Sequence, residues 1–373
     1  MPKVMAWVFT RGIPKLDRWT AWVCTSSTAR LRDQRELDNG PSSRILWAMM
    51  NRRFMLASVG AGLVAPHILR ADILGLDSIF ADLPQMRSLQ ILRGNDLIFA
   101  EAREAGGLDR LANIKSCSKS IVSLLLGTAF DRSEIASIND TIGDLAPGLL
   151  PRDATPGARD ITLQDLVTLR AGLERTSGAN YGGWVSSSNW VANALSRPFV
   201  AEPGGQMLYS TGSTHVLGAV LAEVTGQSLH ELAVERIGEP LGIAIPPWTR
   251  DPQGHFLGGN EMALRPTAML KVAQMVRDNG VYDGTQVVSG NWILASTQAY
   301  TRSNWSGLSY GYGWFLSATG FALGRGYGGQ IMAVHQERGL AVAITSDPTQ
   351  PARSNGYFGD LMQLLNGPGL SVA

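Results

Sequence analysis

Strand-like segments lie near both ends of this chain, and a long helical stretch separates them. Near the start, segments 88–92 and 97–101 flank the turn residues Gly94-Asn95-Asp96, which is the pattern of a β-hairpin. Three further strand-like segments lie far downstream, at 310–316, 330–335 and 340–346. Strands at both ends with helices between them predict an α+β fold, in which one antiparallel sheet is assembled from both ends of the chain and flanked by helices.

The stretch between the strands carries helix signals. Thr162 can cap a helix and Asp165 follows three residues later, as in a capping box. Apolar residues recur at helical spacing over 216–224 and stop at Thr225-Gly226. Further helices are predicted at 267–276, 292–296 and 358–365. We therefore expect an α/β part at about 80–130 and 285–366, and an inserted all-helical part at about 131–284.

The chemistry-bearing feature is Ser116-Cys117-Ser118-Lys119, which opens the apolar run 121–126. Residues three apart share a helix face, so the Ser116 hydroxyl is expected beside the Lys119 amine. Burial among leucines lowers the pKa of a lysine, which can then accept a proton. A helix N-terminus also favours developing negative charge. The pattern predicts an activated serine nucleophile with its own base, although a lysine that extends to solvent would fit the four residues alone.

Composition excludes several classes of function. The 373 residues are 45% hydrophobic and 17% charged, with a net charge of +1, so nothing favours nucleic acid as a partner. The two cysteines do not suggest a disulfide framework. None of the five histidines has metal-ligand spacing. We expect no metal, no organic cofactor and a small-molecule substrate, and the oligomeric state is left open.

Residues 49–71 resemble a bacterial export signal of the twin-arginine type. Arg52-Arg53 and Phe54 precede a short apolar run that ends at Ala65, and Ala71 is a candidate cleavage position. The run is too short to span a bilayer. We expect export to the periplasm, or a cytoplasmic protein if the signal does not function. A buried core helix is the alternative, and residues 1–48 are interpreted as a doubtful extension.

A tyrosine in a glycine-rich loop is the candidate proton relay. Tyr209 lies in the segment 203–212, directly before a predicted helix. A phenol held near a lysine ammonium has a lowered pKa and can shuttle protons. Taken by itself, Tyr209 would fit a core or turn position better than a catalytic one.

Several ordered motifs together resemble the serine β-lactamase and penicillin-binding-protein-like hydrolases. Within them the chain is similar to class C-like carboxylesterases and 6-aminohexanoate-dimer hydrolases. The resemblance covers about residues 80–366, and the expected catalytic domain is 72–366. Its motifs are Ser-x-x-Lys at 116–119, the segments 161–173, 203–210 and 216–226, Gly-Tyr-Gly-Trp at 311–314 and Gly-Tyr-Gly-Gly-Gln at 326–330.

The resemblance implies a β-lactamase-like fold and a role for each motif residue. Ser116 would be the nucleophile, Lys119 its base and Tyr209 the relay to the leaving group. Gly324-Arg325-Gly326 falls where many relatives have Lys-Thr-Gly. The backbone N–H groups of Ser116 and Tyr327 would form the oxyanion hole.

Two departures from the family pattern concern the substrate. Thr211 stands where relatives have the asparagine of Tyr-x-Asn, and no lysine or histidine occupies the Lys-Thr-Gly position. Relatives use those groups around a β-lactam or a D-Ala-D-Ala peptide, so their absence disfavours both activities. Arg325 either supplies a compensating cation or points to solvent.

Aromatic and glycine residues are the candidates for the substrate cleft. We predict substrate contacts from Tyr181, Trp184 and Arg325, and from Gly326 and Gly328 beside the oxyanion hole. Trp190 is interpreted as core. Asn260 and Glu261 are further cleft candidates, and their place is left open.

The sequence therefore predicts a serine hydrolase that cleaves a carboxylic ester or amide through an acyl-enzyme on Ser116. The alternatives are an oligoamide or peptide hydrolase, a β-lactamase or D-Ala-D-Ala carboxypeptidase, and a non-catalytic binding relative. The run 324–329 matches Gly-x-Gly-x-x-Gly, but a strand-like segment follows instead of a helix, which argues against a dinucleotide site. No Gly-x-Ser-x-Gly elbow is present, which disfavours the α/β-hydrolase fold.

Overall fold

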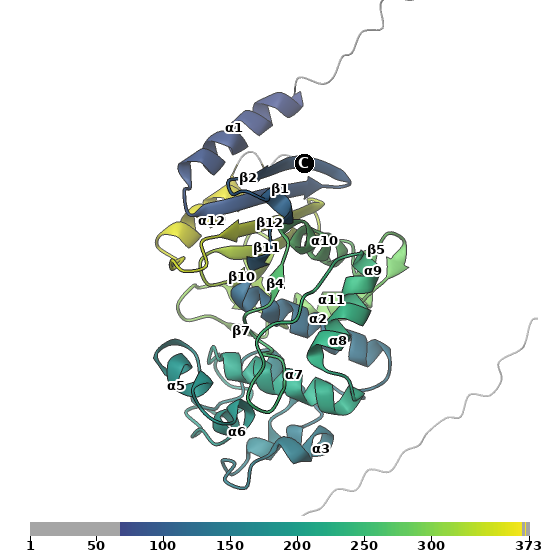
Figure 1. Ribbon diagram of the computed structural model, residues 1–373, viewed down its shortest axis with the longest axis vertical. Coiled ribbons are helices and arrows are strands. Elements are labelled where there is room, and N and C mark those ends of the chain that lie inside the picture. The colour runs from purple at the N-terminus through teal and green to yellow at the C-terminus, as the bar shows by residue number, and fades with distance from the viewer. Residues whose placement is uncertain (1–67, 368–369, 371–373) are drawn as a thin grey trace, which may run out of the picture. The chain divides into compact units, whose positions relative to one another are not determined.

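One antiparallel sheet of eight strands organises the structure, in the order β2-β1-β12-β11-β10-β9-β8-β7 (Figure 1). The computed structural model describes residues 68–367 and 370. The strands are β1 Met86–Arg93, β2 Asp96–Ala102, β7 Thr301–Arg302, β8 Ser309–Tyr310, β9 Phe315–Leu316, β10 Ala322–Gly326, β11 Gln330–His335 and β12 Leu340–Ser346. The strand order joins the two ends of the described chain, because β1 lies between β2 and β12.

The pairing of β1 with β12 confirms that both ends of the chain build the sheet. Leu89 pairs with Ile344 and Ile91 with Val342, while β2 covers the other edge of β1. Both central strands are almost completely buried. A strand buried on both faces reads as a continuous apolar run, which is why the sequence predicts β11 and β12 with their observed bounds.

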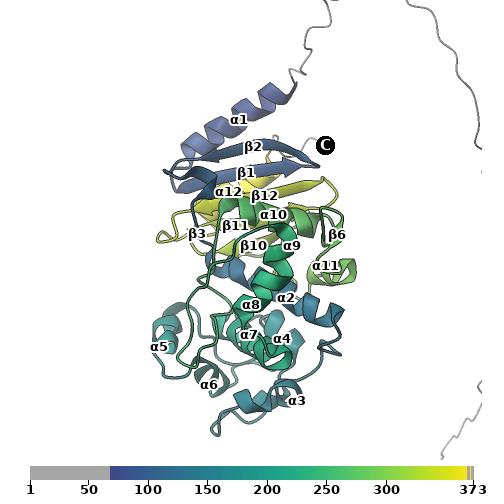
Figure 2. The same cartoon turned by 45° about the vertical axis from the view of Figure 1, so that its right-hand side comes forward.

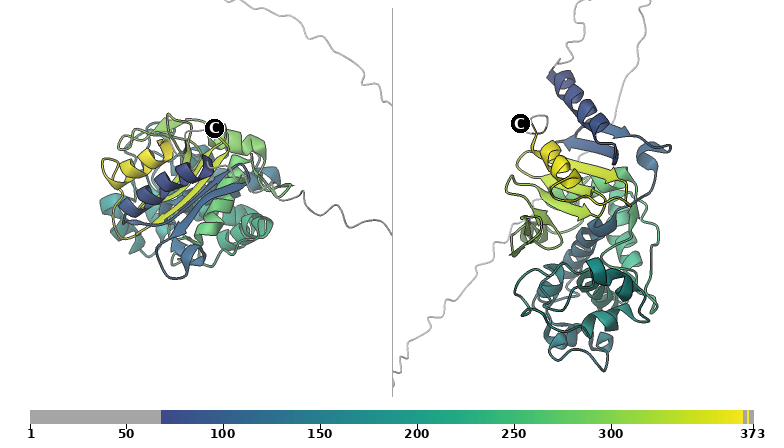
Figure 3. Two further views of the ribbon diagram at one scale, coloured as in Figure 1. Left: turned by 90° about the horizontal axis from the view of Figure 1, so that it is seen from above. Right: turned by 90° about the vertical axis from the view of Figure 1, so that its left-hand side faces the viewer.

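Helices cover both faces of the sheet. On one face, α1 (Ile68–Asp82) and α12 (Tyr357–Asn366) lie side by side (Figure 3), and Phe80 and Leu361 join a hydrophobic cluster with strand residues such as Leu89. On the other face, α10 (Pro266–Arg277) packs on β12 and β11. Two hydrophobic clusters therefore share the sheet, one on each face.

The central helix α2 (Ser118–Asp131) joins the sheet to the helical part. It contacts β10 on one side and α7 (Thr211–Thr225) on another. Figure 2 shows the shorter helices gathered around α7, below the sheet. They are α3 Ile142–Leu145, α4 Leu163–Val167, α5 Tyr181–Val185, α6 Trp190–Leu195 and α8 Leu229–Ala233. Helix α9 (Glu239–Leu241) lies nearer α10, whose Lys271 donates to the Leu241 carbonyl oxygen.

The capping signal read from the sequence is present. The Thr162 hydroxyl accepts from the Asp165 amide, and the Asp165 carboxylate accepts from the Thr162 amide. This capping box satisfies otherwise unpaired amides at the start of α4. Helix α7 ends at Gly226, which has a left-handed φ of 68°, as glycine permits after a helix.

Two predicted elements differ in the structure. Segment 310–316 is not one strand, because β8 and β9 form a hairpin and the turn between them holds Gly311 and Gly313. A Cβ at Gly311 would lie 2.0 Å from the Ser296 carbonyl oxygen, so close packing of the turn replaces a continuous strand. Helix α10, expected within the helical part, packs on the sheet instead and thus belongs to the α/β part. The short helix α11 (Gly290–Ser296) includes the predicted helix 292–296.

Most of the predicted N-terminal extension and export-like segment lies outside the described residues, as does the alternative core helix at 54–65. Helix α1 includes the candidate cleavage position Ala71. Within the described ranges, no helix combines the length and apolarity that a bilayer-spanning segment needs.

Candidate active site

Ser116 and Lys119 lie side by side where η2, a short 3₁₀ turn over Lys115–Cys117, runs into α2. The Lys119 Nζ atom is 3.2 Å from the Ser116 Oγ atom. The turn and the helix are continuous, so residues three apart remain on one face, as the sequence predicts. An amine is thus within hydrogen-bond reach of the hydroxyl that it would deprotonate.

Lys119 is surrounded by groups that accept hydrogen bonds but carry no negative charge. Its ammonium donates to the Gly259 carbonyl oxygen at 2.7 Å and lies 3.3 Å from the Thr211 Oγ1 atom. The side chain is buried, and burial lowers the pKa of Lys119 to about 7. Desolvation disfavours the charged form of a lysine. The amine is therefore neutral in a large fraction of molecules at physiological pH.

Tyr209 faces the same two residues. Its hydroxyl forms a hydrogen bond with the Ser116 side chain, and its ring centroid is 5.0 Å from Lys119 Nζ. The expected lowering of its pKa is wrong. Burial raises the pKa of Tyr209 to about 12, and this outweighs the hydrogen bond to Ser116 and the charge of Arg325. Tyr209 is a neutral phenol in this site, which is the form that can donate a proton.

Two backbone amides near Ser116 are available to an incoming oxyanion. Strand β10 packs against the Ser116 turn, because Gly326 has no side chain there: a Cβ would lie 2.4 Å from the Ile114 carbonyl oxygen. Tyr327 follows directly, with its side chain largely exposed. Among the described residues, neither the Ser116 amide nor the Tyr327 amide has a hydrogen-bond acceptor. Donors of this kind suit an oxyanion hole.

Ser116 opens into a cavity of about 610 Å³, within the size range of small-molecule sites. Four predicted site residues, Tyr181, Arg325, Gly326 and Tyr327, line it together with Ser116 and Tyr209. The remaining lining residues are Lys115, Arg175, Ser177, Gly178, Thr211, Asn260, Glu261, Trp305, Phe315, Pro348 and Ala352.

Trp184 does not contact this cavity, which corrects its prediction as a substrate-binding residue. Its side chain is fully buried against Trp190 and Leu257, and its indole N–H donates to the Trp190 carbonyl oxygen at 2.9 Å. The apolar ring is therefore part of a small satellite core. The interpretation of Trp190 as core is confirmed.

Gly328 also lies outside the cavity lining. It has a left-handed φ of 87°, and a Cβ there would lie 2.4 Å from the Asp347 carbonyl oxygen. The glycine shapes the turn between β10 and β11, which leaves Tyr327 at the cavity. Its place is explained by backbone geometry, so the predicted substrate contact is not observed.

Several lining residues were not predicted. Thr211, noted in the sequence only as a departure, lies beside Lys119, and its hydroxyl is 3.0 Å from Ser177 Oγ. Trp305 and Phe315 form an aromatic wall around Tyr209. Neither Thr211 nor the aromatic pair follows a periodic sequence pattern, and only the fold brings these residues to the cavity.

Arg325 points into the site and not to solvent. Its guanidinium lies over the rings of Phe358 and Trp305, at 3.3 Å and 4.7 Å from their centroids, and donates to the Ala352 carbonyl oxygen at 3.0 Å. Burial lowers the pKa of Arg325 to about 10, so it stays charged at neutral pH. Its buried Nη1 atom has no hydrogen-bond partner among the described residues.

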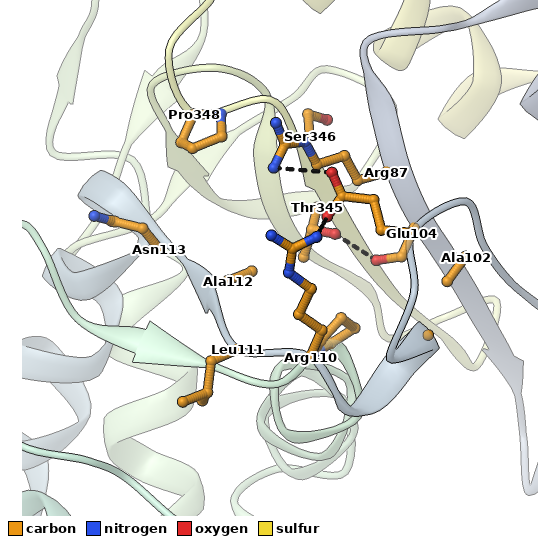
Figure 4. Close-up of a pocket in the computed structure, with 13 residues that line it drawn as sticks. Arg87, Ala102, Glu104, Arg110, Leu111, Ala112, Asn113, Thr345, Ser346 and Pro348 are labelled. Atoms are coloured by element: carbon orange, nitrogen blue, oxygen red, sulfur yellow. Dashed lines mark hydrogen bonds and ion pairs between the residues drawn. The ribbon is translucent and has the colours of Figure 1, made fainter.

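A second, smaller hollow of about 130 Å³ adjoins the segment that leads to Ser116. Figure 4 shows the Glu104 carboxylate between the guanidinium groups of Arg87 and Arg110. These ion pairs neutralise the polar lining, and Ser116, Lys119 and Tyr209 do not reach it. The cavity at Ser116 is therefore the better candidate for chemistry.

No metal-binding cluster is found in the part of the chain that the structure describes. Within residues 68–367 and 370, no three histidine, cysteine, aspartate or glutamate side chains are arranged to hold a metal ion. Deep in the protein, the His215 imidazole and the Asp251 carboxylate pair with each other at 3.0 Å.

Comparison with known proteins agrees with the fold. The Beta-lactamase family model matches residues 88–364, and the chain belongs to this family, whose members are hydrolases with a β-lactamase-like fold. D-alanyl-D-alanine-carboxypeptidase/endopeptidase AmpH of Escherichia coli is 27% identical over 184 residues, which are 44% of this chain and 46% of AmpH. The chain thus spans about half the length of the curated relatives it matches.

Solved structures show the same fold at low sequence identity. EstCE1, a hydrolase with promiscuous acyltransferase activity, has a TM-score of 0.67 and 18% identity, covering 82% of this chain and all of its own. A family VIII carboxylesterase has a TM-score of 0.62 and 17% identity, and the match covers 81% of this chain and 97% of the carboxylesterase. A Bacillus anthracis protein described as a 6-aminohexanoate-dimer hydrolase has a TM-score of 0.64 and 16% identity, and the match covers 78% of this chain and 82% of that protein.

Proposed function

We propose that this protein is a serine hydrolase that cleaves a carboxylic ester or amide bond through an acyl-enzyme on Ser116. The observation that supports this most directly is the 3.2 Å contact between Ser116 Oγ and a buried Lys119 amine with a pKa of about 7. A base with a pKa near the working pH combines the correct protonation state with a useful driving force. Ser116 lines a cavity large enough for a substrate, and Lys119 contacts it from the buried side.

In the first step, Lys119 takes the hydroxyl proton while Ser116 Oγ bonds to the substrate carbonyl carbon. The electron pair of the carbonyl moves to its oxygen, and the amides of Ser116 and Tyr327 hold that oxyanion. The intermediate then collapses, the bond to the leaving group breaks and Tyr209 protonates it. The proton that Lys119 took from Ser116 then passes to the Tyr209 phenolate and restores the phenol.

In the second step, water attacks the acyl-enzyme. Lys119 accepts a water proton as the new C–O bond forms, the bond from carbon to Ser116 Oγ breaks, and the serine regains its proton. Atoms and protons balance over the cycle, with one water consumed and one acid released.

The cavity favours a substrate that has an apolar portion next to an anionic one. Trp305 and Phe315 supply an aromatic wall, and Arg325 lies beside them with a buried nitrogen lacking a partner. Arg175 adds a second cation. Of the described lining residues only Glu261 is acidic, and it is paired with Lys115. A guanidinium in such a place suits a carboxylate.

The alternatives within the family are amide hydrolysis of short oligoamides or peptides, a β-lactamase or D-Ala-D-Ala carboxypeptidase, and a binding relative without activity. The names of AmpH and the 6-aminohexanoate-dimer hydrolase support amides as candidates. Thr211 and Gly324, which replace the asparagine and lysine of many relatives, disfavour β-lactams. The Lys119 environment disfavours a binding role, because such a role does not require an amine with a lowered pKa.

The deciding experiment is hydrolysis of p-nitrophenyl butyrate by the full chain, with intact mass recorded during turnover. We expect release of p-nitrophenol and a mass increase of one butyryl group, and expect Ser116→Ala to lose both. A folded wild-type protein with neither activity nor adduct, also towards a panel of amides, would overturn the proposal in favour of the binding relative.

Substrate charge can be tested with a matched pair of esters. Mono-p-nitrophenyl succinate carries a carboxylate at the end of its acyl group, and p-nitrophenyl butyrate has the same chain length without it. We expect the anionic ester to have the higher kcat/KM. Arg325→Met should lower the ratio of the two kcat/KM values by about tenfold or more, as for loss of a charged hydrogen bond. An unchanged preference would contradict the assignment of Arg325.

Export to the periplasm also remains a proposal, supported by Arg52-Arg53 ahead of a short apolar run. Replacing both arginines with lysine should retain the protein in the cytoplasm of an expressing bacterium. Fractionation and immunoblotting of the two versions would measure this, and equal periplasmic amounts would argue against a twin-arginine signal.

A further inference from the structure

Lys115, the residue directly before the proposed nucleophile, has a backbone conformation that lysine rarely adopts. Its φ is +51°, in the left-handed region where a Cβ is close to the backbone and where glycine is the usual residue. Strained residues persist only when their surroundings hold them, and they concentrate at functional sites. The contacts that hold Lys115 therefore bear on how Ser116 is presented.

Those contacts form a closed ring around Lys115. The Lys115 Nζ atom is 2.9 Å from one carboxylate oxygen of Glu261. The other oxygen of Glu261 accepts from the Asn113 side-chain amide at 2.6 Å. The Asn113 side-chain oxygen in turn accepts from the Lys115 backbone N–H at 2.9 Å. One carboxylate thus fixes both the side chain and the backbone of Lys115.

Glu261 is itself held in place by the loop that contacts the base. Its own φ is +67°. Two residues earlier, the Gly259 carbonyl oxygen accepts from Lys119, and Asn260 donates to the Tyr181 hydroxyl at 2.9 Å. On the other side, the Met262 carbonyl oxygen accepts from the Ile114 amide at 2.9 Å. The loop 259–262 therefore joins the base, the cavity wall and the turn of the nucleophile.

We infer that Glu261 is a positioning residue, whose carboxylate holds Lys115 in the left-handed conformation that presents Ser116 to the substrate. The inference rests on the proposed serine hydrolase function and adds a residue to it. Rotation about Lys115 would reorient both the Ser116 amide, a proposed oxyanion donor, and the Ser116 side chain. It would also move the Lys115 Cβ atom, which packs 3.0 Å from the Cβ position of Gly326.

The test compares two double variants that differ only in the cost of this conformation. Glu261→Ala opens the ring. In one double variant, Lys115→Gly is combined with Glu261→Ala, which removes the ammonium and lets residue 115 adopt positive φ freely. In the other, Lys115→Ala is combined with Glu261→Ala, which removes the same ammonium but keeps the conformational cost of positive φ. The readouts are the rate of fluorophosphonate labelling of Ser116 in the full chain, and kcat and KM for p-nitrophenyl butyrate.

We expect Glu261→Ala to lower the labelling rate and kcat by about fivefold to thirtyfold, the factor that corresponds to the cost of one left-handed residue, with a smaller change in KM. The glycine double variant should recover to within about twofold of wild type, and the alanine double variant should stay low. Glu235→Ala, which breaks the surface ion pair with Arg132, is the matched control and should keep the wild-type rate.

Each outcome has a distinct meaning. Equal rates in wild type and Glu261→Ala, or equal rates in the two double variants, would overturn the positioning role while the labelled wild type supports the hydrolase. A folded wild-type protein that is never labelled would overturn the proposed function, and the inference with it. Circular dichroism of all variants checks that each is folded.

Discussion

At the scale of single residues, the site depends on a lysine that is buried without a counter-ion. Lys119 donates to the Gly259 carbonyl oxygen and lies beside two hydroxyl groups, those of Ser116 and Thr211. These dipoles accept hydrogen bonds from the ammonium, but they do not repay the cost of its desolvation. The consequence is an amine that can exchange a proton near neutral pH.

The pH dependence of the reaction should report this amine. Burial lowers the pKa of Lys119 to about 7, and only the neutral form can accept the Ser116 proton. We therefore expect kcat/KM to be low in acid, to rise through about pH 7 and to level off above it, since this profile reports the free enzyme. Lys119→Arg, which stays charged, should lose activity at every pH. A flat profile from pH 5 to 9 would contradict the assignment of Lys119 as base.

Tyr209 should matter most when the leaving group needs a proton. Tyr209→Phe keeps the ring that packs on Phe315 and Trp305 and removes the hydroxyl alone. We expect kcat to fall by about 10²–10⁴-fold for an ethyl ester or an amide. The fall should be smaller for a p-nitrophenyl ester, because p-nitrophenolate leaves without protonation. An equal loss for both leaving groups would point to a role for Tyr209 in orienting Ser116 instead.

At the scale of elements, the site depends on a strand that lies directly against the nucleophile turn. Gly324 and Gly326 of β10 permit this approach. A Cβ at Gly324 would meet the Ser120 hydroxyl at 2.8 Å, and one at Gly326 would meet the Ile114 carbonyl oxygen at 2.4 Å. Because backbone atoms cannot move aside as a flexible side chain can, Gly326 is the more constrained of the two.

Gly326→Ala should therefore impair catalysis by moving β10 away from the turn. We expect kcat to fall on the order of 10²-fold, as for loss of one oxyanion donor, because the Tyr327 amide moves with the strand. Gly148→Ala provides the control, since nothing lies within 4 Å of a Cβ there. Kinetics and thermal denaturation of both variants would measure this, and an unchanged kcat in Gly326→Ala would argue against Tyr327 as a donor.

The elements that sequence patterns predicted well are those with a strong local signal. The buried strands β11 and β12 and the capped helix α4 follow from apolar runs and cap residues. Segment 310–316 was predicted as one strand because its residues favour β-structure, yet packing of Gly311 against Ser296 turns the chain. Tertiary contacts of this kind are invisible to local propensity.

The site could be predicted where chain spacing or motif order determines it. Ser116 and Lys119 share a face because they are three residues apart, and burial of the following leucines implied the lowered pKa. The pKa of Tyr209 was predicted in the wrong direction, because nearby charge was considered and desolvation was not. Trp305 and Phe315 were not predicted, because only the fold brings them to the cavity, and Glu261 was a cleft candidate whose contact with Lys115 no local pattern shows. Trp184 has the residue type of a cleft wall but packs in the core.

At the scale of the whole molecule, one sheet is shared by two hydrophobic clusters. Residues on alternate sides of β1 and β12 contribute to one cluster or the other. Ser116 and Lys119 lie on the α2 side, where α2 and α7 pack, whereas α1 and α12 cover the opposite face. Tyr209 and Phe315 nevertheless pack in the α1 and α12 cluster, so the site draws on both clusters.

A pair of leucines in the first hairpin tests how much the α1 and α12 cluster stabilises the fold. Leu89 of β1 is fully buried among the α1 and α12 cluster, whereas Leu97 of β2 is 54% exposed. We expect Leu89→Ala to lower the free energy of unfolding by about 2–5 kcal/mol, and Leu97→Ala to change it by about 0.5 kcal/mol or less. Urea denaturation would measure both. Equal free energies of unfolding for the two variants would contradict a core role for Leu89.

The pairing of β1 with β12 has a consequence for the timing of biosynthesis. Ser88 and Thr345 share a hydrogen bond across a separation of 257 residues, so at about 5–20 residues per second the ribosome needs about 13–50 s to make the partner strand. Throughout that interval β1 lacks β12, its neighbour on one edge, and for most of it Ser116 lacks the Tyr327 amide. A nascent chain that ends before β10 therefore holds Ser116 and Lys119 without the proposed oxyanion donor that follows this strand.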